Sequence, residues 1–466
     1  MNQPVSLRDT PIGFIAKLRF WLENYFGIEG QGSTLRREII AGATTFLAAA
    51  YVIVVNPDIN SAAGIPFSAG VTATVLVSFL GTLAMALYAK NPILIAPGMG
   101  INILFAYTMV VGAKIPLQIA LGCVLWGSVI FTVLAFFNVR QAVIDGIPAS
   151  LRNAISCGMG LFIALIGLVN AKFISADPFT VVHAAPFNPI ILTFLAGLMV
   201  TIALVARKVP GALILGIIAT TLMAIPIGRL WGDATAYWPE GAASVTLVNW
   251  SGLFAAPDFS FLGQVDLLGS LRLEYLPYIF VLVFTNFFES LSTFLGISEA
   301  GNLKDADGNP RNIKQSMHVD ALAALASAPL GTSPATAYIE SAAGISQGGR
   351  TGLVALVAAL LFLPFLFLSP LLSLVPSIAT APVLIMIGVF MMDTITKIDW
   401  HSYEEAIPAF LVILLIPLTY SITLGIALGF IVFVLLKLLI GKANTVKPIM
   451  WWVAALSVFL VMRVQY

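Results

Sequence analysis

Two glutamates lie inside long apolar segments, where a carboxyl group is costly unless it faces a cavity, a partner or a proton. Glu289 occurs in VFTNFFESLSTFLG and Glu340 in TSPATAYIESAAGI. Asn286, Glu289 and Thr293 follow i, i+3, i+7 spacing with Ser290 beside them, so a helix would place them on one polar stripe. A carboxylate accepts N–H donors, and desolvation moves its titration toward neutral pH. We predict that both glutamates bind a ligand and a proton; hydrogen bonding between helices is the alternative for each.

The first of two interrupted apolar segments is ILIAPGMGINILFAYTMV, in which Pro97, Gly98 and Gly100 precede Asn102. Proline removes a backbone donor and glycine weakens a helix, so these residues break it. We predict an extended piece followed by a half-helix. Asn102 is a candidate ligand contact, although an asparagine beside a break can also cap its own half-helix.

The second interrupted segment is LGTSPATAYIESAAGI. Gly331 breaks the chain, Ser333 is expected to cap a half-helix, Pro334 suits its first turn and Gly344 its end. Backbone groups exposed at membrane depth are tolerated only beside a polar cavity, and half-helix N-termini add partial positive charge there. Paired broken segments in two halves of a chain indicate a midplane binding site.

These observations predict one site built from both breaks and the polar stripe. Its predicted substrate-binding residues are Glu340, Glu289, Asn286, Asn102, Thr293 and Ser333. Glu289 and Glu340 are also the predicted proton-coupling residues. No catalytic residue, metal ligand or cofactor is predicted, because the apolar segments offer no nucleophile–base pair or metal cluster.

The remaining residues that could do chemistry are few. His183, His318 and His401 are expected in loops or at span ends, so a histidine proton relay is not predicted. Cys123 and Cys157 both lie in apolar segments, where we expect core residues rather than a disulfide or a metal site. Any proton that moves would therefore be carried by a carboxylate.

The elements that hold this site must be membrane-spanning helices. Of 466 residues, 59% are hydrophobic and 10% charged, and the mean hydropathy is +0.99. About 20 apolar residues cross the hydrocarbon as a helix. Fourteen spans are predicted, near 38–56, 66–89, 93–111, 116–138, 150–170, 187–206, 211–229, 275–297, 314–330, 334–346, 350–369, 371–393, 405–420 and 422–441. The fold class is thus an all-α polytopic membrane protein.

The spans resemble two inverted repeats of seven, because both span 5 and span 12 open with an apolar-Pro-Ser step; chance likeness of Leu-rich helices is the alternative. Asn56 and Pro57 are expected to end the first span. The stretch 450–462 is short for a crossing, so we expect it at the interface or packed on the bundle. Residues 11–26 alternate apolar and basic side chains, as suits a helix on the inner surface.

Basic residues concentrate in alternate loops, which predicts that the N-terminal segment 1–36 lies on the cytoplasmic side. The membrane is expected to be the plasma membrane, which is the inner membrane in bacteria. The same count makes 230–274 the longest extracytoplasmic loop. The net charge of +1 indicates no acidic partner, and nucleic acid is not expected as a partner.

At these residues the sequence resembles the adenine/guanine/hypoxanthine permease branch of the nucleobase:cation symporter family. The likeness rests on blocks along nearly the whole chain, including GSTLRREIIAGATTFLAAAYVIVVNP, APGMGINILFAYTMV, NFFESLSTFLG and GTSPATAYIESAAGISQGGRTGL. It implies a core (transport) domain of 37–138 and 275–369, a gate domain of 150–229 and 371–441, and a C-terminal segment 442–466. It also implies short antiparallel strands in spans 3 and 10, with the base held between them and span 8.

By motif position, Glu340 is similar to the family's substrate-binding glutamate of span 10, and Asn102 to its span 3 asparagine. Asn286 and Glu289 stand at the two polar positions of span 8. The family usually has Asp where this chain has Glu289, and Gly-Thr in place of 292–293 (Ser-Thr). The longer acid reaches about one methylene further, which leaves the preferred purine open.

The resemblance implies import of purine bases by proton symport, with an elevator-like movement of core against gate. A uracil or xanthine carrier is the nearest alternative, and an anion transporter on the same scaffold is another. The sequence leaves open which purine is preferred, proton or sodium as coupling ion, and monomer or homodimer. A membrane enzyme is not expected, since no nucleotide loop or metal motif is found.

Overall fold

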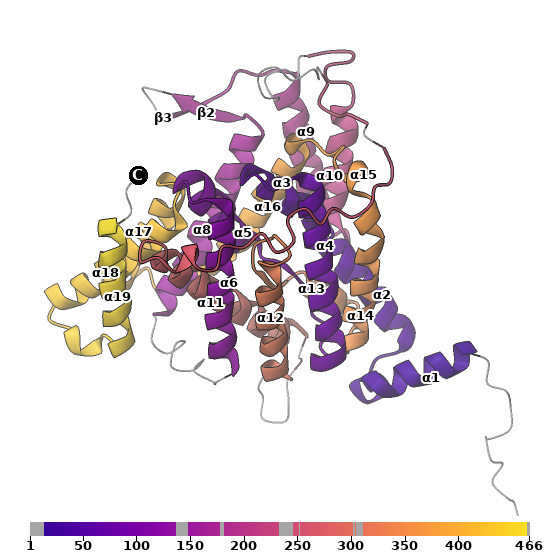
Figure 1. Cartoon of the computed structure of the whole chain (residues 1–466), viewed down its shortest axis with the longest axis horizontal. Helices are drawn as coiled ribbons and strands as arrows, with labels where there is room; N and C mark the ends of the chain where they lie inside the picture. The colour runs from indigo at the N-terminus through magenta and orange to yellow at the C-terminus, as the bar shows by residue number, and fades with distance from the viewer. Residues whose placement is uncertain are drawn as a thin grey trace, which may run out of the picture.

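The computed structural model describes residues 14–136, 148–177, 181–232, 246–250, 252–301, 303 and 311–463. It is mostly helical (Figure 1). Helices of the first half are α1 (Phe14–Phe26), α2 (Leu35–Ala49), α3 (Val52–Ala62), α4 (Phe67–Ala84), α5 (Met99–Ile103), α6 (Leu117–Phe136), α8 (Ala149–Asn170), α9 (Pro189–Ala206) and α10 (Ala212–Ala224). Those of the second are α11 (Leu276–Gly301), α12 (Ile313–Ser327), α13 (Ser341–Ser346), α14 (Gly352–Phe362), α15 (Ser369–Leu372), α16 (Ser377–Met391), α17 (Tyr403–Leu418), α18 (Ile422–Leu439) and α19 (Pro448–Arg463).

Several of these helices are long and apolar enough to cross a bilayer, so the chain is a polytopic integral membrane protein. Among the described residues there are seven such segments: Leu35–Ala62, Phe67–Ala89, Leu117–Phe136, Ala149–Asn170, Pro189–Ala206, Ser377–Lys397 and Ile422–Leu439. Shorter apolar helices include Met99–Gly112, Ala212–Ala224 and Gly352–Phe367. All of them fall within or beside predicted spans. Two π-helical stretches, Met85–Ala89 and Leu104–Gly112, extend α4 and α5.

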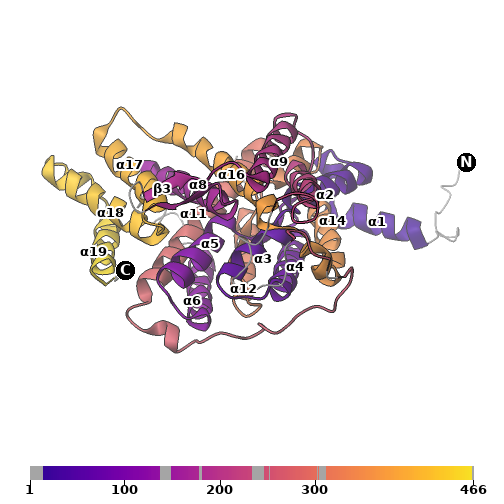
Figure 2. The same cartoon turned by 90° about the horizontal axis from the view of Figure 1, so that it is seen from above.

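The helices pack in two groups in which elements from both halves of the sequence are neighbours. In one group α8 packs on α16 and α17, α9 on α10 and α16, and α17 on α18. In the other, α2 packs on α14, and α12 packs on both α4 and α6. Figure 2 shows α4, α6 and α12 on one side of the molecule and α9, α16 and α17 on the other. The apolar terminal helix α19 packs mainly against α18.

Both interrupted segments contain a short strand, as the family resemblance implied. Strands β1 (Ile95–Pro97) and β4 (Ala335–Ala337) pair antiparallel, with Ala96 opposite Thr336. Main-chain bonds continue the pairing on both sides, from Gly98 N to Pro334 O at 3.0 Å and from Tyr338 N to Leu94 O at 2.9 Å. The pairing joins segments 240 positions apart in the sequence.

Main-chain groups on the outer edges of these two strands are hydrogen-bonded by hydroxyl groups of adjacent helices. Thr82 Oγ1 on α4 accepts from Ile95 N and donates to Ile95 O, both at 3.0 Å. Ser327 Oγ on α12 accepts from Ala335 N at 3.0 Å. Unpaired main-chain groups are costly in an apolar interior, so these two hydroxyls make the short strands tolerable at their depth.

The prediction that Asn56 and Pro57 end the first span is wrong. Helix α3 continues through Pro57 to Ala62. The buried Asn56 amide donates to Thr74 Oγ1 at 2.7 Å and to Thr332 Oγ1 at 3.1 Å. These bonds explain why a helix with proline inside it persists here, because α3 is held to α4 and to the approach to β4.

Two features lie outside the bundle: a pair of strands that was not predicted, and a segment within the predicted loop 230–274. Strands β2 (Ile174–Asp177) and β3 (Val181–Ala184) form an antiparallel hairpin that projects beyond the helices in Figure 1. Residues 252–271, here called the strap, run across the ends of several helices without a long helix of their own (Figure 2). Ala255 N bonds to Phe367 O, Asp258 N to Thr72 Oγ1 and Gly263 N to Pro329 O. Asp266 N then bonds to Gln118 O on α6.

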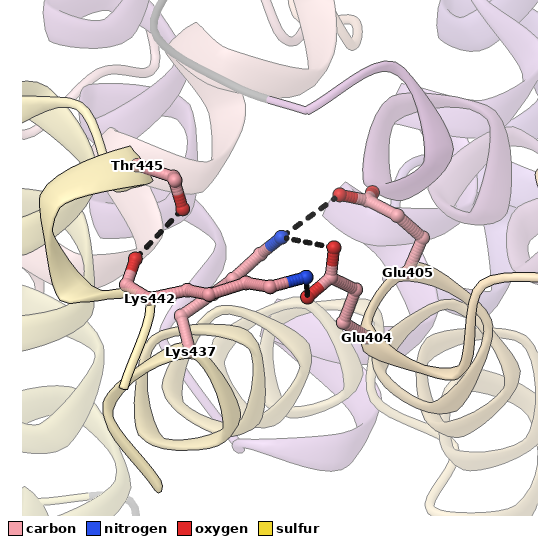
Figure 3. A network of polar contacts seen from close by, with 5 residues as sticks. All are labelled: Glu404, Glu405, Lys437, Lys442 and Thr445. Carbon is pink, nitrogen blue, oxygen red and sulfur yellow. Dashed lines mark hydrogen bonds and ion pairs between the residues drawn. The ribbon is translucent and has the colours of Figure 1, made fainter. Parts of the chain in front are cut away.

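A charge network joins α17 to the end of α18 (Figure 3). The buried Lys437 ammonium lies 3.1 Å from Glu404 Oε1 and 3.6 Å from Glu405 Oε1. Lys442 Nζ donates to Glu404 Oε2 at 2.9 Å. Two cations and two carboxylates balance, so the network stabilises the junction of α17 and α18 without a net charge.

Candidate functional site

The site is centred where Glu289 of α11 meets the glycine-rich turn between β1 and α5. A Cβ atom placed on Gly98 would lie 3.5 Å from Glu289 Oε1, and one on Gly100 would lie 3.5 Å from Oε2. The Gly98 position would also lie 2.8 Å from Thr336 Cγ2 of β4. The absence of a side chain at Gly98 therefore lets Thr336 of β4 approach the turn, and both glycines lie within van der Waals reach of the Glu289 carboxylate. Glu289 Oε2 is buried and has no hydrogen-bond partner among the described residues.

Glu340 follows the other strand, β4, and lies just before α13. Its Oε1 accepts a hydrogen bond of 2.6 Å from the Tyr51 hydroxyl. Tyr338, two residues earlier, donates its hydroxyl to the Pro97 carbonyl, next to Gly98. The rings of Tyr51 and Tyr338 lie 6.4 Å apart between centroids. Two tyrosines thus connect the surroundings of Glu340 to the turn that faces Glu289.

Two predicted amide residues are buried with unused hydrogen-bonding atoms. Asn102 lies within α5, and neither its Oδ1 nor its Nδ2 has a partner in the described structure. It therefore does not cap its half-helix, which was the alternative reading. Asn286 on α11 is also buried, and its Oδ1 is without a partner among the residues described. Buried amide groups normally find partners, so these atoms are suited to a polar ligand.

Thr293 is buried one helical turn beyond Glu289 on α11, as the predicted stripe required. The expectation that Ser333 caps a half-helix and that Pro334 opens it is wrong. Pro334 lies directly before β4, and α13 begins only at Ser341. The strand pairing with β1 takes precedence here over the local capping pattern. Ser333 is nevertheless buried, with an Oγ that has no partner in the described part of the chain.

Sequence reasoning missed a further carboxylate next to β4, that of Asp320 on α12. Its Oδ2 accepts a hydrogen bond from Ser290 Oγ, which in turn lies 2.9 Å from Thr336 Oγ1 of β4. Asp320 is fully buried. The available signal was an acid at the seventh position of the predicted span 314–330.

The histidines lie apart from this constellation, although not all lie in loops. His318 is inside α12, where its ring stacks on Phe136 at 4.1 Å between centroids. His183 lies in β3. His401 lies in the turn before α17. The arrangement around the strand crossing thus offers carboxylates and neutral amides, which together recognise a small polar ligand that has both donors and acceptors.

A buried polar site at two interrupted helices within a polytopic membrane fold defines a membrane transporter. Comparison with known proteins agrees. Residues 36–446 match the family described as Permease family. The chain is 37% identical to adenine permease AdeP of Escherichia coli (strain K12) over 447 residues, covering 95% of this chain and 96% of that protein. The chain belongs to this permease family.

A second relative is guanine/hypoxanthine permease PbuO of Bacillus subtilis (strain 168), which is 39% identical over 429 residues, with 91% of this chain and 96% of that protein covered. The predicted resemblance to purine permeases is thereby confirmed. Among solved structures, the transmembrane domain of the cyanobacterium bicarbonate transporter BicA superposes with a TM-score of 0.61 at 16% identity, covering 84% of this chain and 97% of that one. At that identity the likeness concerns the fold alone.

Proposed function

We propose that this protein imports purine nucleobases, namely adenine, guanine or hypoxanthine, together with a proton. The observation that carries the proposal is that Glu289 faces the turn after β1, while Glu340, bonded to Tyr51, follows β4. Asn102 on α5 and Asn286 on α11 add buried polar atoms that have no partner among the described residues. A purine presents N–H donors and ring-nitrogen acceptors on its edges. Carboxylates accept the donors, and amide groups complement the acceptors.

The two glutamates divide the tasks in this proposal. Glu340 has one oxygen oriented by Tyr51 and is placed to hold the base by accepting its N–H groups. Glu289 has a buried oxygen without a partner among the described residues, which supports a role in taking up and releasing the proton. A carboxylate in an apolar surrounding titrates closer to physiological pH than one in water, which suits it to proton coupling.

The transport cycle we propose is of the elevator type, within fourteen spans arranged as two inverted repeats. The core domain comprises 37–138 and 275–369, and the gate domain 150–229 and 371–441. Two observations support the repeat: β1 pairs with β4, and hydroxyls of α4 and α12 serve equivalent strand edges. The packing of α8 on α16 and α17 supports a separate gate. The N-terminus is proposed to be cytoplasmic.

Uptake by cells that lack their own purine carriers tests the substrate class. Radiolabelled adenine, guanine, hypoxanthine and uracil would be compared with and without a protonophore, and with sodium replaced by potassium. We expect saturable purine uptake that collapses with the protonophore and is insensitive to sodium. Uptake of uracil alone would favour the pyrimidine or xanthine carrier. Absence of all uptake by correctly inserted protein would contradict the purine proposal and lead to a screen of small anions.

Two substitutions test the site. Glu340→Gln should abolish or strongly weaken purine binding, whereas Glu289→Gln should retain binding and lose proton-driven accumulation. Glu274→Gln is the matched control, since Glu274 is more than half exposed in the loop before α11. If all three variants bound and accumulated purines equally well, the site would lie elsewhere in the protein. The proposal that the substrate is a purine would still stand.

A further inference from the structure

Helix α8 is held unusually close to its neighbours on both sides of Met159. A Cβ atom on Gly158 would lie 2.7 Å from Ile416 Cδ1 and 3.1 Å from the Val412 carbonyl, both on α17. A Cβ atom on Gly160 would lie 2.9 Å from the Gly388 carbonyl on α16. Such contacts leave no room for any side chain, so the two glycines fix α8 against α16 and α17.

Met159 itself faces the strand crossing rather than these helices. A Cβ atom on Gly100 would lie 3.2 Å from Met159 Sδ and 3.6 Å from its Cε, while the same position lies 3.5 Å from Glu289 Oε2. The methionine side chain and the carboxylate therefore flank one glycine. Met159 is 4% exposed, so this contact is buried.

The contact also joins α8 to α5, the half-helix that follows β1. Gly100 belongs to α5, next to β1, whereas Met159 belongs to α8, which packs with α16 and α17. Met159 thus extends from the group that contains α8, α16 and α17 toward the glycine that faces the Glu289 carboxylate. A thioether is polarizable and packs well against a flat aromatic ring.

We propose that Met159 is a specificity-determining residue, which forms the apolar wall of the base site beside Glu289 and limits the bulk of the base there. This inference rests on the proposed purine transport and deepens it. The rigid backbone on both sides of Met159 keeps the wall in place, so an added group on the base cannot be accommodated by movement of α8. The volume of the Met159 side chain sets the limit.

The test compares parent purines with their methylated derivatives as competitors of purine uptake and as ligands of the purified protein. In the wild type we expect the parent base to bind more tightly than the methylated base. Met159→Ala should reduce this preference by about tenfold, which corresponds to the loss of one close apolar contact. Met159→Leu, of similar volume, should keep the ratio of the wild type. Met199→Ala is the control, because Met199 is 65% exposed on α9.

A structural role alone would lower the amount of folded protein or the maximal rate for all bases equally, and an unchanged ratio would overturn the inference. Should Met159→Ala fail to fold, Met159→Val removes less of the wall and should shift the ratio in the same direction by a smaller factor. Failure of the wild type to bind any purine would instead contradict the proposed function. The two failures are therefore distinguishable.

Discussion

The Tyr51 hydroxyl donates a hydrogen bond of 2.6 Å to Glu340 Oε1, and this bond joins the two halves of the chain at the proposed site. Tyr51 lies at the junction of α2 and α3, while Glu340 lies between β4 and α13. A carboxylate has two oxygens, so a bond that fixes one of them also sets the direction of the other.

Tyr51→Phe should therefore weaken purine binding by about tenfold without preventing insertion, because it removes one hydrogen bond to a charged group and leaves the ring in place. Binding to purified protein measures the effect. Tyr88→Phe serves as the control, since Tyr88 is 59% exposed. Binding by Tyr51→Phe that equals the wild type would show that Glu340 is oriented by other contacts.

Asp320→Asn should reduce transport strongly while expression persists. Asp320 accepts from Ser290, which contacts Thr336 on β4, so the carboxylate links α12 to α11 and to the strand. An amide accepts at its oxygen only, and its NH2 group would add a buried donor where Oδ1 has no hydrogen-bond partner among the described residues. Uptake rates by Ser290→Ala should fall less, because Asp320 remains. The control is the exposed Asp393→Asn; normal uptake by Asp320→Asn would reduce the carboxylate to a packing role.

Glu38→Gln should destabilise the folded protein by about 3 kcal/mol, because a buried acceptor would be replaced by a partial donor. Glu38 is fully buried and accepts from Arg350 N at 2.8 Å, Thr351 N at 3.1 Å and Thr351 Oγ1 at 2.6 Å. Thermal unfolding in detergent measures the loss, with the exposed Glu29→Gln as control. An unchanged midpoint of thermal unfolding would mean that residues 348–352 (GGRTG) are held by contacts other than those with Glu38.

Asp258, in the strap, should contribute to the stability of the folded protein at neutral pH, and this contribution should be lost in acid. The Ser68 hydroxyl and the Ser260 main-chain N–H lower the pKa of Asp258 below its ordinary value of 3.8. A depressed folded-state pKa contributes stability that is present above about pH 4 and is lost as pH falls through the lowered value. Asp258→Asn should therefore be less stable than the wild type at neutral pH, and the two should converge below about pH 4. A difference that stays constant across that range would contradict this assignment.

The sequence was sufficient for the features that depend on side-chain type within an apolar span. Glu289, Glu340 and Asn286 were predicted because charged or amide groups are rare there. The helix period placed Asn286 and Glu289, but not Glu340, on one face. The breaks at Pro97 and Gly98 were identified by local backbone preference.

The remaining parts of the site depend on contacts between distant segments. Tyr51 gave no signal, because tyrosine is tolerated on apolar helices and its partner is 289 positions away. Ser333 and Pro334 have a helix-start pattern, but pairing with β1 makes the following residues a strand. Asn56 was assigned to a helix end because proline follows it, whereas side-chain bonds to two threonines keep the helix intact.

The strap bonds to the ends of α4, α6 and α12 and to the turn after α14, which all belong to the proposed core domain. Trp126 of α6 adds a further bond, from its indole N–H to the Leu267 carbonyl at 3.0 Å. In an elevator cycle the strap would therefore move together with the core domain as one rigid body. It would not act as a lid that opens and closes over that domain. A fluorophore attached near Leu268, which is 82% exposed, would then report the position of the core domain along the membrane normal without disturbing the purine site.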